Sequence, residues 1–250
     1  MTDLASLSPW LWVVAPVVIM VAYTVFGLSG FGATAISVPI LAHFLPVSYL
    51  VPTVALLDLV SSSLVGVAHR EQVSKEELLR LLPWMFAGFV LGVTILAGAP
   101  DQYLRLALGA FAVALGVHGI LNPTLARTIS KLWAIPAGVV GGAVATVFGA
   151  GGPIYATYMM GRTRDKGVVR STISTMIAIS AFSRAIVYAV TGLLLHVAVF
   201  AGALVLSPFV WIGLKIGQRI HVGLSTEQLR RAIGALLVFT GSSLLLRAFL

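Results

Sequence analysis

The sequence predicts an all-α polytopic membrane protein, and its composition is the first observation that does so. Of the 250 residues, 59% are hydrophobic and only 10% are charged, with a mean hydropathy of +1.03. Soluble domains carry about 25% charged residues. Two further observations, the layout of the apolar runs and an internal repeat, extend this prediction to an architecture.

The apolar runs fill most of the chain, and a membrane-spanning helix needs roughly 20 such residues. The predicted helical segments, in chain order, are 10–26, 33–45, 51–69, 81–99, 104–121, 134–148, 152–160, 170–192, 195–218 and 229–249. The connectors left over are too short for a soluble nucleotide-binding domain. Cysteine is absent, so disulfides and thiolate metal sites are excluded.

Glycines interrupt two of the apolar runs where a continuous helix would otherwise form. The first interruption reads FGLSGFGATAISVP at 26–39, and the second reads FGAGGPIYATY at 148–158. The interrupting residues are Gly27, Gly30 and Gly32 in the first, and Gly149, Gly151, Gly152 and Pro153 in the second. Each interruption is predicted to be the turn of a helical hairpin.

An internal repeat relates the two halves of the chain. Matched positions lie 125 residues apart, as Pro83 and Pro208 do. The pairs are Pro83/Pro208, Gly88/Gly213, Gly92/Gly217, Gly98/Gly223, Leu104/Leu229, Arg105/Arg230, Gly109/Gly234, Ala110/Ala235 and Gly116/Gly241. At a spacing of 119, Gly30 and Gly32 match Gly149 and Gly151. We therefore predict a first repeat at 1–121, a linker at 122–132 and a second repeat at 133–250.

Loop charge indicates that the two repeats are inverted, because Lys and Arg in short loops mark the cytoplasmic side. The connector at 43–50 has no Lys or Arg, whereas its counterpart at 161–170 has four. The next connector reverses the bias, with three basic residues in 70–80 and none in 192–196. Inversion requires an odd number of crossings per repeat, so each repeat is predicted as a glycine-broken hairpin plus three spanning helices. Both termini are then periplasmic.

The second hairpin is too short for two full spans, so we expect it to be re-entrant, with its tip inside the bilayer, and the first to be similar. Broken helices at matching positions of inverted repeats are the best sequence indication of a transporter's substrate site. Helix N-termini at such tips present N–H groups and a positive dipole end to small anions. The predicted binding residues at the tips are Gly30, Phe31, Gly32, Ala33, Thr34, Gly149, Ala150, Gly151 and Gly152. Close helix packing is the alternative role for glycine, and it is favoured for Gly88, Gly92, Gly109 and Gly116.

Two ionisable residues lie inside predicted membrane helices, Asp58 and Arg184. Such residues are costly in a bilayer and indicate function. The planar guanidinium of Arg184 suits a sulfonate or carboxylate, and the alternative is a structural ion pair with Asp58. Asp58 is also a candidate for ion or proton coupling. Ser180 and Ser62 lie one helical turn from these charges, on the same faces, and complete the predicted site.

The paired breaks GFGATAISVP and GAGGPIYATY, in a duplicated chain of this length, resemble the TauE/SafE sulfite exporter family, also called the sulfonate uptake permease family. The resemblance covers nearly the whole chain. It implies a bacterial inner-membrane protein that moves sulfite, sulfonates such as taurine or sulfoacetate, or related small anions. The chain departs from the fuller GxGGG pattern of the family at Ala33, Thr34 and Pro153.

We therefore expect a multi-pass secondary transporter of small anions, working by alternating access around the paired broken helices. An anion channel is the alternative, because it could use the same helix ends. No enzyme activity is expected, since no Ser-His or Asp-Asp pattern stands in related positions. No two histidines have ligand spacing, so neither a metal nor another cofactor is expected. The expected partners are a small anion and lipid; nucleic acid is not one, because the net charge of +8 is spread over short loops. A homodimer is left open.

Overall fold

The computed structural model describes residues 9–29, 32–65, 72–121, 129–194, 197–219 and 226–249, and within them the chain is helical, without strands. The helices are α1 (Leu11–Ser29), α2 (Ala33–Leu41), α3 (Val47–Val65), α4 (Lys75–Gly98), α5 (Asp101–Leu121), the short 3-10 helix η3 (Lys131–Trp133), α6 (Ala134–Phe148), α7 (Gly152–Arg162), α8 (Lys166–Val190), α9 (Val197–Arg219) and α10 (Thr226–Phe249). The all-α class is confirmed.

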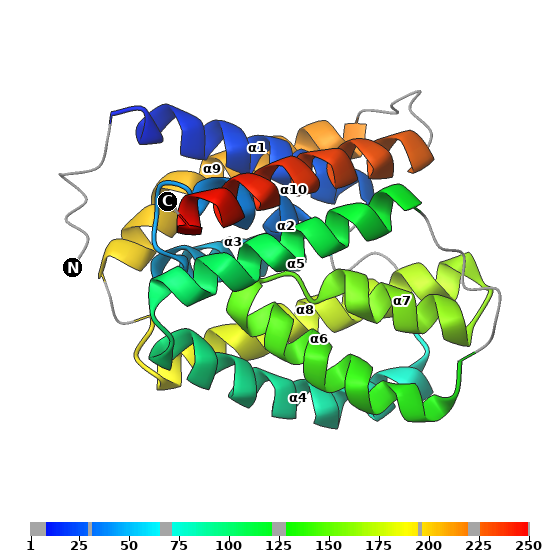
Figure 1. The fold of residues 1–250 in the computed structure, drawn as a ribbon. Helices are drawn as coiled ribbons and strands as arrows, with labels where there is room; N and C mark the ends of the chain where they lie inside the picture. Colours follow the sequence, from blue (N-terminus) through cyan, green and yellow to red (C-terminus); the bar gives the residue numbers. More distant parts are fainter. Residues whose placement is uncertain are drawn as a thin grey trace.

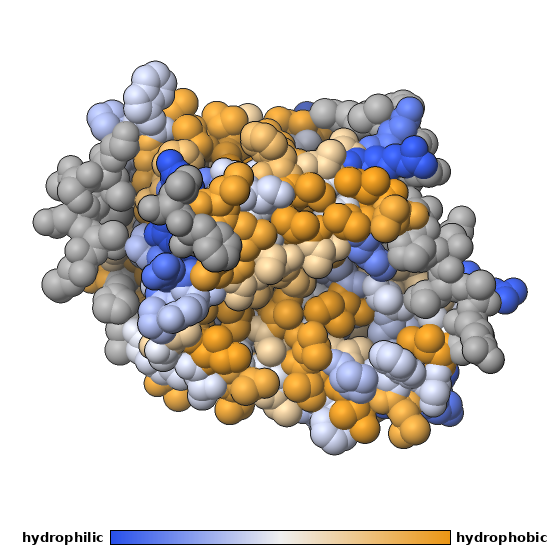
Figure 2. Space-filling model, viewed as in Figure 1, coloured by the Kyte–Doolittle hydropathy of each residue, from blue (hydrophilic) through white to orange (hydrophobic). Residues whose placement is uncertain are grey.

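Six of the described helical stretches are long and apolar enough to cross a membrane. They are Leu11–Leu28, Lys75–Gly98, Asp101–Leu121, Lys131–Phe148, Gly167–Val190 and Val197–Arg219. Figure 2 shows apolar residues over the middle of the visible face, while hydrophilic residues gather toward the ends of the helices. The prediction of a multi-pass membrane protein is therefore confirmed.

Both predicted glycine interruptions separate two helices. The first lies between α1 and α2, and the second between α6 and α7, where residues 149–151 join the two helices. Gly27, however, lies inside α1 rather than in the break. A Cβ atom there would lie 2.9 Å from the Leu214 carbonyl oxygen, so this glycine lets α1 approach α9 and belongs to helix packing.

The helices pack in three close pairs, α1 with α9, α4 with α6 and α5 with α10, which lie side by side in Figure 1. Glycines permit each approach. A Cβ atom on Gly88 of α4 would lie 2.3 Å from the Val139 carbonyl oxygen of α6. The packing role predicted for the glycines of α4 and α5 fits this geometry, because small residues let backbones come close in a membrane.

The α5–α10 pair runs antiparallel. Gly109 of α5 faces Gly241 near the end of α10, whereas Gly116 near the end of α5 faces Gly234 closer to the start of α10. By the same criterion α1 and α9 are parallel, because Gly213 faces Met20 and Gly217 faces Thr24.

Several helices begin earlier than their apolar runs. Helix α4 begins at Lys75 rather than at 81, because the Ser74 side chain caps the Glu77 N–H. Helix α8 begins at Lys166 rather than at 170, because Asp165 accepts hydrogen bonds from the first turn. These caps satisfy backbone donors that would otherwise lack partners at a helix N-terminus.

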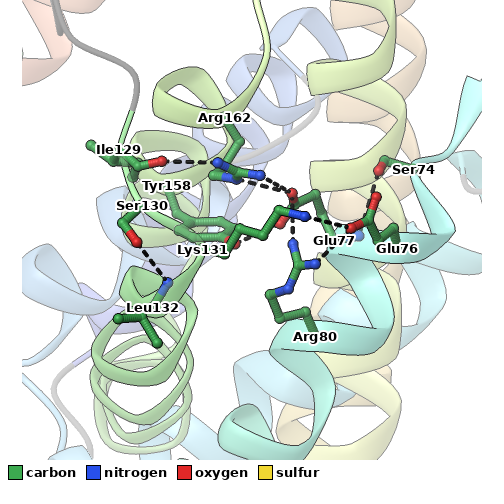
Figure 3. A network of polar contacts seen from close by, with 10 residues as sticks. All are labelled: Ser74, Glu76, Glu77, Arg80, Ile129, Ser130, Lys131, Leu132, Tyr158 and Arg162. Carbon is green, nitrogen blue, oxygen red and sulfur yellow. Dashed lines mark hydrogen bonds and ion pairs between the residues drawn. The ribbon is translucent and has the colours of Figure 1, made fainter.

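A polar cluster joins the start of α4 to the end of α7 and to the segment before α6 (Figure 3). The buried carboxylate of Glu77 is its centre: it accepts a hydrogen bond from the Tyr158 hydroxyl at 2.5 Å and pairs with Arg162 at 2.8 Å and Arg80 at 2.9 Å. Arg162 also donates to the Ile129 carbonyl oxygen. The hydrogen bond to Glu77 raises the pKa of Arg162, so its guanidinium stays charged.

Candidate functional site

The two hairpin tips meet at a cavity of about 30 Å³ inside the helical bundle. Its walls come from both hairpins and from the middle of α3 and α8. The lining residues are Phe26, Gly32, Ala33, Thr34, Ala35, Asp58, Ala145, Gly149, Ala150, Gly151, Gly152, Pro153, Tyr155, Ile177, Ser180 and Arg184.

The backbone at both tips has conformations that favour glycine. Gly32, the residue before α2, has φ 98°, and Gly149, the residue after α6, has φ 73°, and residues with a side chain rarely adopt such values. At Gly149 there is also no space, since a Cβ atom would lie 2.0 Å from Cγ2 of Thr34. The absence of a side chain at Gly149 therefore lets the two tips touch.

Helices α2 and α7 both begin at the cavity. Their first turns contribute Ala33 and Thr34 from α2, and Gly152 and Pro153 from α7. The first turn of an α-helix carries N–H groups without intrahelical partners, and neither Gly32 nor Gly151 supplies a side-chain cap. The cavity is therefore bordered by two positive helix ends.

Arg184 provides a full positive charge at the same place. Its side chain is 2% exposed, and it donates to the Ala145 carbonyl oxygen at 2.8 Å and to the Ser180 carbonyl oxygen at 3.4 Å. Its Nη2 atom lies 3.1 Å from Oδ2 of Asp58. A guanidinium has five N–H donors, so donors remain after these three contacts.

Asp58 holds the first hairpin to this arginine. Its Oδ1 atom accepts a hydrogen bond from the Tyr23 hydroxyl at 2.8 Å, and Oδ2 accepts one from the Thr34 hydroxyl at 2.8 Å. The ion pair between Asp58 and Arg184, which the sequence left as the alternative role of this arginine, is thus present, and it links α3, α8 and both tips. Each carboxylate oxygen already accepts a hydrogen bond, and the guanidinium of Arg184 and the first-turn N–H groups of α2 and α7 are the donors left at the cavity.

The structure brings most of the predicted site residues together around one cavity, and these are Gly32, Ala33, Thr34, Gly149, Ala150, Gly151, Gly152, Ser180, Arg184 and Asp58. Gly30 and Phe31 lie outside the described residues, as does the side chain of Ser62. Gly151 has a packing reason as well, because a Cβ atom there would lie 2.6 Å from the Gly141 carbonyl oxygen.

The sequence interpretation missed several lining residues, namely Phe26, Ala35, Ala145, Pro153, Tyr155 and Ile177. Tyr155 is the polar one among them. Its place in the first turn of the helix after the second glycine break was the available signal, because that turn was already predicted to face a ligand. The other tip hydroxyls, Thr146 and Thr157, donate to carbonyl oxygens one turn back in their own helices.

Comparison with known proteins adds a family assignment to this geometry. Residues 15–244 match the sulfite exporter TauE/SafE family. The chain belongs to this family. It is also similar to the probable inner membrane transporter protein TsaS of Comamonas testosteroni, with 24% identity over 192 residues, which cover 76% of this chain and 80% of that protein. No solved structure matches. The resemblance inferred from the sequence is therefore confirmed, and so is the class of membrane transporter related to sulfite exporters.

Proposed function

We propose that the protein is a secondary transporter of small sulfur oxyanions, and that it binds them between the two hairpin tips. The observation that carries the proposal is the cavity where Arg184 and the first turns of α2 and α7 converge. Positive helix ends and a charged guanidinium both favour an anion. Sulfite is the primary candidate, with sulfonates such as taurine or sulfoacetate as larger alternatives.

Cavity size supports the smaller substrate. About 10–15 Å³ of such space holds one water molecule, so a cavity of about 30 Å³ has room for two or three water-sized groups. A compact anion such as sulfite needs little widening of this space, whereas the two-carbon tail of taurine needs more. We therefore expect sulfite to be preferred.

We also propose that the two halves are inverted repeats. Helices α5 and α10 are equivalent in the sequence repeat and pack antiparallel, which supports opposite orientations of the halves in the membrane. Equivalent glycines also have equivalent neighbours: Gly88 faces the Val139 oxygen and Gly213 faces the Met20 oxygen, and Val139 follows Met20 by the same 119 residues that separate the two tips.

Re-entrant hairpins are part of the same proposal. Helix α2 has 9 residues and α7 has 11, so at about 1.5 Å per residue they are about 14 and 17 Å long. A bilayer core is about 30 Å thick. The second helix of each hairpin is therefore too short to cross this core, which supports tips that lie inside the bilayer. From there, movement of the two hairpins would expose the cavity to each side of the membrane in turn.

Topology can be tested by reporter fusions. With repeats at 1–121 and 133–250 joined by a cytoplasmic linker at 122–132, fusions after residues 75, 127 and 166 should all report the cytoplasm, and both termini the periplasm. A periplasmic signal after residue 166 would mean that the second hairpin crosses the membrane fully, and inversion would then fail.

The test of function is an uptake screen in proteoliposomes with radiolabelled sulfite, taurine, sulfoacetate and simple carboxylates. A transporter gives saturable flux that responds to a proton or sodium gradient, whereas a channel gives flux that follows the electrochemical gradient of the anion alone. Asp58 is the proposed coupling group, so Asp58→Asn should keep sulfite exchange but lose acceleration by a proton gradient.

A further inference from the structure

Tyr155 is a buried polar side chain at the cavity that no other part of the fold accounts for. The residue is 1% exposed and lines the cavity. Its polar neighbours are Arg184 and the Ser180 hydroxyl, and its interaction with Ser180 is the weakest of the influences on it. Within the described part of the chain, however, this hydroxyl makes no hydrogen bond.

A buried hydroxyl without a protein partner is unfavourable unless a water molecule or a ligand in the cavity accepts its hydrogen bond. Such groups are rare in folded proteins and require an explanation. Replacement by phenylalanine would remove the penalty and keep the ring. The presence of tyrosine therefore indicates a hydrogen-bond acceptor that occupies the cavity for part of the functional cycle.

The ring of Tyr155 is held in a fixed place. A Cβ atom on Gly141 would lie 2.3 Å from one edge of the ring, and a Cβ atom on Gly151 would lie 3.1 Å from the other. The two glycines thus let the ring sit between the legs of the second hairpin. A tightly held ring presents its hydroxyl in one direction, which reduces the entropy lost when a ligand binds.

We propose that the Tyr155 hydroxyl donates a hydrogen bond to an oxygen of the transported anion and selects for ligands with an acceptor at that point. This inference rests on the proposed function. With Arg184 and the helix ends it adds a further donor to the cavity, where both oxygens of the lining residue Asp58 already accept a hydrogen bond. The fitting ligand is therefore a deprotonated oxyanion, which accepts hydrogen bonds at every oxygen.

The experiment compares Tyr155→Phe with Tyr49→Phe in the full-length protein purified in detergent. Tyr49 is the matched control, because its hydroxyl donates to the Ala198 carbonyl oxygen at 3.1 Å and lies outside the cavity. Sulfite affinity is measured by titration calorimetry, and the apo melting temperature is measured by thermal unfolding. Chloride, a spherical anion, serves as the comparison ligand.

We expect Tyr155→Phe to weaken sulfite binding roughly ten- to a hundredfold, the effect of one hydrogen bond to a charged group, with chloride binding affected much less. Its apo melting temperature should be unchanged or higher, because an unsatisfied hydroxyl has gone. Tyr49→Phe should melt earlier and bind sulfite within about twofold of the wild type.

Two results would overturn this inference alone: wild-type sulfite affinity in Tyr155→Phe, or weaker binding accompanied by an apo stability loss as large as that of Tyr49→Phe. The second result would mean that the hydroxyl has a structural partner. A wild-type protein that binds none of sulfite, taurine and sulfoacetate would overturn the proposed function and this inference with it.

Discussion

Alanine replacements of Arg184 and Asp58, singly and together, would separate a structural ion pair from a substrate contact. The two single changes are not equivalent. If Arg184 is removed, Asp58 keeps hydrogen bonds from Tyr23 and Thr34. If Asp58 is removed, Arg184 loses its carboxylate partner, and its closest remaining acceptors among the described residues are the carbonyl oxygens of Ala145 and Ser180, at 2.8 and 3.4 Å.

The expected loss of unfolding free energy follows from these contacts. Leaving one charge of a buried pair uncompensated costs about 3–5 kcal/mol. The loss in Arg184→Ala should be at or below the lower end of this range, because two hydroxyl donors still stabilise the Asp58 carboxylate. Asp58→Ala should fall near the upper end. The double variant should be more stable than Asp58→Ala, because it contains no unpaired charge.

Sulfite affinity should behave differently from stability. A substrate contact by Arg184 is worth roughly ten- to a hundredfold in affinity, and the double variant cannot restore it. Arg184→Lys should lie between wild type and Arg184→Ala, because it keeps a charge but loses the planar fork.

Thermal unfolding in detergent measures the stability of each variant. The concentration dependence of sulfite uptake into proteoliposomes, on the same preparations, measures its apparent sulfite affinity. Recovery of stability without recovery of affinity in the double variant supports the substrate contact. If the double variant regains wild-type uptake, Arg184 serves only to pair with Asp58, and the proposed binding role is refuted.

Two further predictions concern packing and the Glu77 cluster. Gly149→Ala should lower the melting temperature and abolish uptake, because its Cβ atom would meet Thr34 at 2.0 Å in a left-handed conformation. The control Gly98→Ala has open space around it and should leave melting temperature and uptake unchanged. Wild-type melting and uptake in Gly149→Ala would contradict the contact between the tips. Glu77→Gln should cost about 1.5–3 kcal/mol of unfolding free energy, because the charge of Glu77 is shared among several donors. The exposed control Glu76→Gln should melt like the wild type. Equal melting temperatures of the two variants would show that the burial of Glu77 adds nothing to stability.

The sequence predicted the features of the site that leave a pattern along the chain. Glycine breaks that recur in both halves located the tips, and charges within apolar runs located Asp58 and Arg184. Tyr155 was missed because a tyrosine in an apolar helix resembles an ordinary core residue, and only the fold shows that its hydroxyl has no hydrogen-bond partner among the described residues.

Some helix N-termini are set by residues close by in the sequence, and others are set by contacts that only the fold brings together. The early start of α4 could have been predicted, since Ser74 followed by Glu77 is a local capping pattern. The start of α3 at Val47, four residues before the predicted 51, could not. Its first N–H is capped at 2.7 Å by Asp101 of α5, a residue that lies 54 positions away.

The Glu77 cluster makes the two ends of a repeated scaffold chemically unequal. At the matched spacing of 125, the counterparts of Glu77 and Arg80 are Gly202 and Val205, so the other half cannot form the same ion pairs. The other end of the scaffold uses a different and more exposed ion pair, Asp101 with Arg105, and the same aspartate caps the first N–H of α3. Because salt screens exposed charge pairs more than buried ones, raised ionic strength should weaken the Asp101–Arg105 pair more than the contacts of the buried Glu77 carboxylate.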